Sequence, residues 1–154
     1  MTVPLNLTAA RAHPAAGRAR PVPRGARVML AYVDTSCLVA IAFAEAGAAR
    51  LAGRLRRFER LFSSNLLEAE LRSALMRERV PDPPSALLSR ITWVYPTRPL
   101  TAEFERMVDA GYLKGADLWH LANALFLAPE RRELTFLTLD RRQRAVAAQL
   151  GFAV

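Results

Sequence analysis

A chain of 154 residues has the size of one domain, because a single hydrophobic core commonly serves about 100–150 residues. Its hydrophobic content of 52% argues against a disordered chain, and no apolar run reaches the roughly 20 residues that a membrane-spanning helix requires. One cysteine and two histidines exclude an intrachain disulfide and a Cys/His zinc site, so we expect a cytoplasmic protein.

The formal net charge of +8 is distributed unevenly along the chain. Residues 1–28 contain five arginines and no acidic residue, so residues 29–154 have a net charge of only +3. A mildly basic domain is compatible with RNA binding but does not establish it, because a modest positive charge is also common on ordinary surfaces.

Residues 1–28 are rich in Ala, Pro and Arg, and four prolines interrupt any helical or strand periodicity. We interpret them as a disordered basic tail whose removal should leave the fold unchanged, or as the product of a start codon assigned upstream of the true one. A basic arm that follows the RNA backbone is the second interpretation. A targeting signal is the least favoured, because the segment lacks an apolar core.

From Met29 onward, strand-like and helix-like segments alternate. In chain order we expect a strand at 29–33, helices at 36–44 and 46–57, a strand at 61–63, and a helix at 65–78 with Asn65 as N-cap. A short helix at 85–89, a strand at 92–95, a helix at 101–110 capped by Thr101, and a helix at 116–127 follow. The chain should end with a strand at 134–139, a helix at 141–150 and a strand at 152–154. This alternation predicts an α/β fold with a central, mainly parallel sheet of about four to five strands and helices on both faces.

Asp34 and Asp140 each follow an expected strand and precede an expected helix. In open parallel sheets, ligands bind at the carboxyl ends of the strands, so two such carboxylates on neighbouring strands would face one crevice. Aspartate is also a favoured helix N-cap. For either residue by itself, capping and a functional role are equally good interpretations.

Asp117 stands near the start of the expected helix 116–127, which is otherwise apolar almost all round. The helix dipole favours an acid at this end, so capping is one interpretation and an anion that ligates a cation is the other. His120 and Asn123 continue a polar stripe with Asp117 at i, i+3 and i+6. We expect His120 to be a buried, hydrogen-bonded residue that supports the site rather than a metal ligand or general base.

The expected helix 65–78 carries two glutamates near its apolar stripe, Glu68 and Glu70. At about 100° per residue, Glu70 lies closer to the centre of the stripe, but the two positions differ by less than about 30°. Periodicity therefore leaves the choice open, with a slight preference for Glu70.

Four motifs follow one another in a specific order. They are Tyr-Val-Asp-Thr-Ser at 32–36, Ser-Ser-x-Leu-x-x-x-Glu-Leu-x-x-Ala-Leu at 63–75, Gly-Ala-Asp-Leu-Trp-His-Leu-Ala-x-Ala-Leu at 115–125, and Phe-Leu-Thr-Leu-Asp-Arg-Arg at 136–142. Together they resemble a PIN domain of the VapC-like toxin type. The resemblance covers about residues 29–154 and implies a three-layer α/β/α domain of the PIN-like kind.

The resemblance also implies the site and its function. It selects Glu70 over Glu68, because the family's acidic residue directly precedes a Leu-Arg-x-Ala-Leu pattern. Ser36 and Thr138 fall where hydroxyls often support the site. The implied activity is that of a ribonuclease acting on tRNA, rRNA or mRNA, as the toxin of a toxin–antitoxin pair, with a cognate antitoxin and a homodimer as partners and no membrane. The implied catalytic and metal-binding residues are Asp34, Glu70, Asp117 and Asp140.

Four carboxylates in one crevice would repel one another unless a cation neutralised them. Oxygen ligands favour a hard ion, so Mg²⁺ or Mn²⁺ is the expected cofactor and zinc is not. Such an ion suits the hydrolysis of a phosphodiester bond. Three basic residues beside the acids are candidates to contact RNA, although a solvated helix face is the commoner role for such side chains: Lys114, Arg141 and Arg142.

The sequence fits three other functions less well. A phosphohydrolase of the haloacid dehalogenase type needs a second Asp two residues after the first, and position 36 is Ser. A phosphoacceptor receiver domain needs a lysine after a late strand, whereas the only lysine is Lys114. A non-catalytic RNA-binding or partner-binding module remains the alternative, and the intact set of four acids counts against it.

Overall fold

The computed structural model describes residues 5–12, 29–81 and 85–154. Its strands are β1 (Ala10–Ala12), β2 (Leu30–Val33), β3 (Arg60–Ser64), β4 (Ile91–Val94) and β5 (Leu134–Leu137). Its α-helices are α1 (Thr35–Ala42), α2 (Ala48–Leu55), α3 (Leu66–Arg77), α4 (Ser85–Leu88), α5 (Thr101–Met107), α6 (Gly115–Leu127) and α7 (Arg141–Gln149). A short 3₁₀ helix, η1 (Leu7–Ala9), precedes β1.

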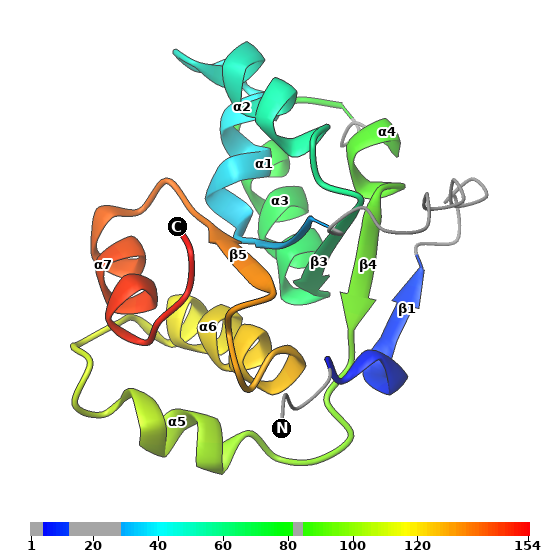
Figure 1. The fold of residues 1–154 in the computed structure, drawn as a ribbon. Coiled ribbons are helices and arrows are strands. Elements are labelled where there is room, and N and C mark those ends of the chain that lie inside the picture. Colours follow the sequence, from blue (N-terminus) through cyan, green and yellow to red (C-terminus); the bar gives the residue numbers. More distant parts are fainter. Residues whose placement is uncertain (1–4, 13–28, 82–84) are drawn as a thin grey trace.

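The five strands form one sheet in the order β1-β4-β3-β2-β5. The pairs β2–β3, β2–β5 and β3–β4 are parallel, and only β1 runs antiparallel to its neighbour β4. The predicted α/β fold with a mainly parallel sheet of this size is therefore confirmed. Since β2 lies between β3 and β5, the residues that follow β2 and β5 meet at one edge of the sheet (Figure 1).

Helices cover both faces of the sheet (Figure 1), and alternating side chains along the strands contribute to two core layers. Tyr32 and Phe136 point toward α5, α6 and α7, where Tyr32 stacks on Phe136 with 5.5 Å between ring centroids. Ala31 and Val33 point to the other face, where they pack with residues of α1 to α4. Because both faces of the sheet are covered, the successive side chains of β2 are apolar. This continuous apolar run made the strand recognisable from the sequence.

The prediction of a disordered tail is wrong for residues 5–12. The backbone N–H of Asn6 donates to the carbonyl of Leu127 at 2.8 Å, and that of Tyr95 donates to the carbonyl of Ala9 at 2.7 Å. Ala9 is buried, and β1 pairs with β4 over three residues. So short a strand has no periodicity to detect, because its stability comes from the edge of β4 rather than from its own sequence. The rest of the expected tail, 1–4 and 13–28, lies outside the described residues.

Two expected helix caps are also wrong. Asn65 precedes α3, but its side chain makes no capping hydrogen bond because its backbone is already helical. Thr101 is the first residue of α5 rather than its cap, and α5 ends at Met107 instead of 110.

The two C-terminal strands are shorter than expected. β5 ends at Leu137, two residues before the predicted end, because Thr138 and Leu139 turn away to bond with polar groups of α1. The expected strand 152–154 is reduced to a single bridge between Ala153 and Thr135. Within the described ranges, no helix combines the length and apolar character needed to cross a membrane.

Candidate active site

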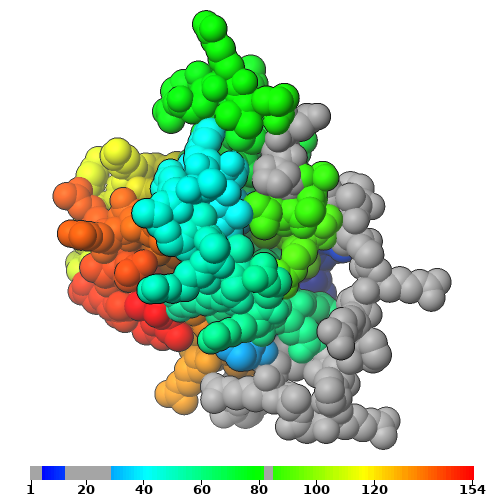
Figure 2. Space-filling view, turned by 90° about the horizontal axis from the view of Figure 1, so that it is seen from above, coloured from blue at the N-terminus to red at the C-terminus, as the bar shows by residue number. Residues whose placement is uncertain are grey.

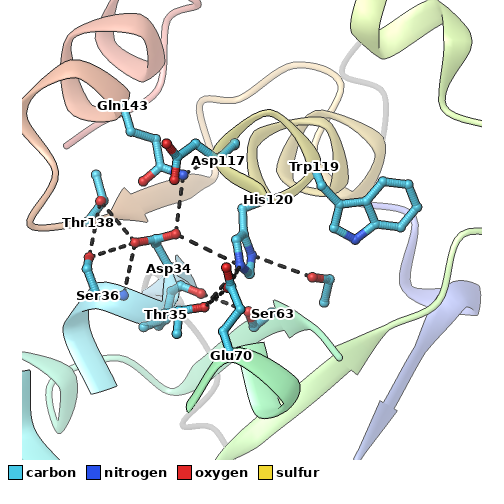
Figure 3. A network of polar contacts seen from close by, with 12 residues as sticks. Asp34, Thr35, Ser36, Ser63, Glu70, Asp117, Trp119, His120, Thr138 and Gln143 are labelled. Atoms are coloured by element: carbon cyan, nitrogen blue, oxygen red, sulfur yellow. Dashed lines mark hydrogen bonds and ion pairs between the residues drawn. The ribbon is translucent and has the colours of Figure 1, made fainter. Parts of the chain in front are cut away.

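Asp34 lies at the centre of a polar network at the carboxyl edge of the sheet (Figure 3). It follows β2, caps α1 and is 4% exposed. Its Oδ2 accepts from the backbone N–H of Ser36 at 3.1 Å, the Ser36 hydroxyl at 2.6 Å and the Thr138 hydroxyl at 3.2 Å. Its Oδ1 accepts from Nε2 of Gln143 at 3.2 Å. The capping interpretation is thus confirmed, and both carboxylate oxygens are held by protein donors.

The hydroxyls of Ser36 and Thr138 tie the β5–α7 connection to α1. Ser36 Oγ accepts from the backbone N–H of Leu139 at 3.0 Å, and Thr138 Oγ1 accepts from that of Asp140 at 3.0 Å. Asp140 is exposed and caps α7 by accepting from the backbone N–H of Gln143 at 2.8 Å. Each hydroxyl therefore contacts Asp34 and the turn that carries Asp140.

Gln143 is a member of the network that the sequence reading missed. It is fully buried, and its Nε2 donates both to Asp34 Oδ1 and, at 3.2 Å, to the backbone carbonyl of Asp117. It occupies a position of the apolar stripe of α7 with Val146, Ala147 and Leu150, at i, i+3, i+4 and i+7. A polar residue on an otherwise apolar helical stripe was the sequence feature that could have identified Gln143 as a buried member of the site. Among the described residues, its Oε1 has no hydrogen-bond partner.

Asp117 lies in the first turn of α6 and is half-buried beside the other acids. Burial raises the pKa of Asp117, and the negative charges of Asp34, Asp140 and Glu70 raise it further. Figure 3 shows Asp117 and Gln143 on one side of Asp34, with His120 and Glu70 on the other. The charges of the other three predicted acids therefore all act on Asp117.

The structure separates Glu70 from Glu68. Glu70 Oε2 accepts from the Thr35 hydroxyl and bonds to His120 Nε2 at 3.0 Å. Partial burial acts to raise the pKa of Glu70, but the bonds from His120 and Thr35 outweigh it, so that the pKa lies below its ordinary value. Glu68 instead forms a surface ion pair with Arg72 at 2.7 Å.

His120 is 1% exposed and is held at both ring nitrogens. Its Nδ1 lies 3.1 Å from the Tyr32 hydroxyl, which accepts from the backbone N–H of Ser64 at 2.9 Å. Burial raises the pKa of Tyr32 far above its ordinary value, so the hydroxyl keeps its proton and is able to donate a hydrogen bond to Nδ1. With Nδ1 as acceptor, a neutral imidazole would carry its own proton on Nε2, which lies 3.0 Å from Glu70 Oε2. His120 is therefore buried and hydrogen-bonded, as expected from the sequence.

A cavity of about 620 Å³ opens beside the acids, and we call it the Asp117 pocket. Its walls combine two of the acids with all three of the predicted basic residues, and those basic side chains are exposed. Figure 2 shows the yellow atoms near the start of α6 against the orange atoms at the start of α7. The pocket is lined by Lys114, Asp117, Leu139, Asp140, Arg141 and Arg142.

The acids around Asp34 form a donor set that fits a hard divalent cation. Over residues 5–12, 29–81 and 85–154, no group of three or more His, Cys, Asp or Glu side chains is close enough to hold a metal ion. The acids nevertheless offer carboxylate oxygens only, and the pKa of Asp117 is raised by its burial and further by repulsion from the other three acids. An ion binding there would use the oxygen ligands that Mg²⁺ and Mn²⁺ prefer and would remove this repulsion.

Comparison with known proteins gives one match. Neither the curated proteins nor the solved structures that were searched contain a significant match. The profile of the PIN domain, a family of nucleases, matches residues 31–149, which are most of the chain and span every one of the four acids. The order of strands and helices and the position of the acids at the carboxyl edge of the sheet agree with this match. The chain belongs to the PIN domain family.

Proposed function

We propose that this protein is a divalent-metal-dependent ribonuclease that hydrolyses RNA phosphodiester bonds. One observation carries the proposal: Glu70 and Asp117 lie beside Asp34 at the carboxyl edge of the sheet, and Asp140 follows the neighbouring strand there. The pKa of Asp117 is raised first by its burial and then by the negative charges of Asp34, Asp140 and Glu70, which agrees with this arrangement. The pocket next to these acids carries basic side chains, which suit a phosphate backbone. The acidic side chains would bind the metal ion, and the basic side chains beside them would bind the RNA phosphates.

The four acids would hold Mg²⁺ or Mn²⁺. When bound, such an ion supplies stabilisation of the charge that develops on the phosphate during hydrolysis. The residues around the acids set their geometry: Ser36, Thr138 and Gln143 fix the two oxygens of Asp34, and His120 fixes Glu70. The three basic residues of the Asp117 pocket would bind the RNA phosphates on either side of the cleaved bond.

The first experiment combines cleavage with metal binding. The native protein should cleave RNA only with Mg²⁺ or Mn²⁺ and should gain about 2.7 kcal/mol of stability at a hundredfold excess of metal over its dissociation constant. Glu70→Gln should lose cleavage and most of the metal-induced shift in melting temperature. Glu68→Gln is the matched control, because Glu68 lies on the same helix but pairs with Arg72. Equal metal shifts in both variants would reject this ligand set, and RNA binding without cleavage would favour the non-catalytic alternative.

We further propose that the ribonuclease is the toxin of a toxin–antitoxin pair and works as a homodimer. The motif resemblance supports this role, and the surface has a cavity that suits the binding of an inhibitor. A second cavity of about 230 Å³ lies between α1, α2 and Leu139, a residue that also lines the Asp117 pocket, and its lining is mainly alanine, leucine and arginine. An apolar segment of the antitoxin would occupy this cavity, while an arginine beside it would pair with the carboxylates.

Growth assays test the toxin role. Expression of the chain alone should arrest growth, and co-expression with the product of the adjacent reading frame should restore it. Asp34→Asn should remove the arrest, and sequencing of new 5′-phosphate ends in cellular RNA after brief induction should reveal the target. Arrest that persists in Asp34→Asn would mean that toxicity arises elsewhere on the protein.

A further inference from the structure

The connection between α5 and α6 carries a large aromatic side chain that does not pack in the core. Tyr112 is 74% exposed. The guanidinium carbon of Arg142 lies 5.9 Å from the centroid of its ring. Because Arg142 also lines the Asp117 pocket, Tyr112 stands at the rim of the candidate active site.

The backbone on both sides of Tyr112 is anchored. Gly111 has a φ of +128°, a conformation that L side chains rarely adopt, and a Cβ there would come within 3.3 Å of Val146 Cγ2 on α7. Leu113 is buried in the core layer formed by α5, α6 and α7. The aromatic ring is therefore exposed although the chain that carries it packs closely against the domain. Such an arrangement presents the ring without a large ordering cost on binding.

We infer that Tyr112 and Arg142 form a stacking platform for an unpaired RNA base beside the phosphate that is cleaved. The inference rests on the proposed ribonuclease function and assigns two residues that would position an unpaired base of its RNA substrate. Aromatic rings and arginine planes are the groups on which proteins stack unpaired bases, and basic side chains follow the backbone. Both kinds of group occur here next to the carboxylates.

Base pairing decides which nucleic acid this platform accepts. In an A-form duplex each base is already stacked between its neighbours, so its faces are not available to Tyr112. A duplex could use only the charges of Lys114, Arg141 and Arg142. The platform therefore distinguishes single-stranded from double-stranded RNA, and the basic residues alone do not.

The test measures binding to a labelled oligonucleotide of about ten uridines in EDTA, which prevents cleavage. Tyr112→Ala should raise the dissociation constant roughly five- to 150-fold, since stacking contributes about 1–3 kcal/mol per base at about 1.4 kcal/mol per tenfold. Tyr112→Phe should bind like the native protein. Tyr112→Leu, which is apolar but not planar, should bind like Tyr112→Ala. Tyr95→Ala is the matched control, because Tyr95 is also exposed and does not line the pocket.

Salt and duplex measurements separate stacking from charge. Tyr112→Ala should leave binding to a duplex of the same length and the salt dependence unchanged, whereas Arg142→Ala should lower the slope of log K against log salt by about 0.7. Native binding of single strands by Tyr112→Ala or by Tyr112→Leu would overturn the platform, and the loss of cleavage in Glu70→Gln would still support the nuclease. A native chain that neither binds nor cleaves RNA would overturn both proposals.

Discussion

Removing one buried hydroxyl, in Tyr32→Phe, should weaken both the fold and the site. The ring of Tyr32 is fully buried and stacks on Phe136, and phenylalanine keeps this packing. The hydroxyl accepts from the backbone N–H of Ser64 at 2.9 Å and lies 3.1 Å from Nδ1 of His120. The substitution therefore removes two hydrogen bonds and changes little else.

The expected loss of stability follows from these two bonds. A buried donor or acceptor that loses its partner costs about 1–3 kcal/mol. The Ser64 N–H bears this cost in full, whereas Nδ1 of His120 retains a weak partner in the Ser64 hydroxyl at 3.5 Å. We expect a loss of about 2–4 kcal/mol, which lowers the melting temperature by roughly 4–16 °C for a domain of this size. Calorimetry or thermal melting monitored by circular dichroism measures the change.

Activity tests the second half of the reasoning. With only the weak contact to the Ser64 hydroxyl left at Nδ1, the imidazole is held less firmly in the orientation that faces Glu70, so the bond to Glu70 weakens. The value of kcat should fall more than KM changes, because Glu70 belongs to the proposed metal site rather than to the RNA-binding surface. Tyr112→Phe removes an exposed hydroxyl and is the control, with an expected change in stability within about 0.5 kcal/mol. A stable Tyr32→Phe would refute the hydrogen-bond argument, and a destabilised variant with native kcat would refute the link to Glu70.

Three further predictions follow from the same network and from the N-terminal strand. In metal-free protein, Asp117→Asn should raise the melting temperature at neutral pH, because the folded protein raises the pKa of Asp117 and its charge therefore costs stability. This gain should vanish below the ordinary pKa of 3.8, where the carboxyl is protonated in both folded and unfolded chains, and a gain that persists there would contradict the assignment. Gln143→Leu should destabilise the fold by about 1–3 kcal/mol, since Asp34 Oδ1 and the Asp117 carbonyl lose their shared donor, and unchanged melting would show that water replaces it. Truncation of residues 1–28 should lower the melting temperature, because β4 loses its antiparallel partner, and an unchanged melt would mean that β1 contributes nothing.

The sequence alone determined the type and order of the main elements. The strand 30–33 is a continuous apolar run, the strand 134–137 is apolar except for Thr135, and α6 is apolar almost all round, so the hydrophobic pattern was sufficient to identify them. Their alternation dictated a mainly parallel sheet. The position of Asp34 and Asp140 after two of the strands followed from the same reading, because parallel strands end at one edge.

Only the tertiary structure decided which polar groups meet. Glu68 and Glu70 differ too little in helical angle for periodicity to separate them; the motif resemblance selected Glu70, but only the structure reveals its partner, His120, 50 residues away in the chain. The bond from Gln143 to Asp34 spans 109 residues, so no local pattern contains it. β1 likewise exists because β4 offers an unpaired edge. Propensity and periodicity predict the secondary structure of a single segment. The partners of a buried side chain depend on other segments, which only the folded chain brings together.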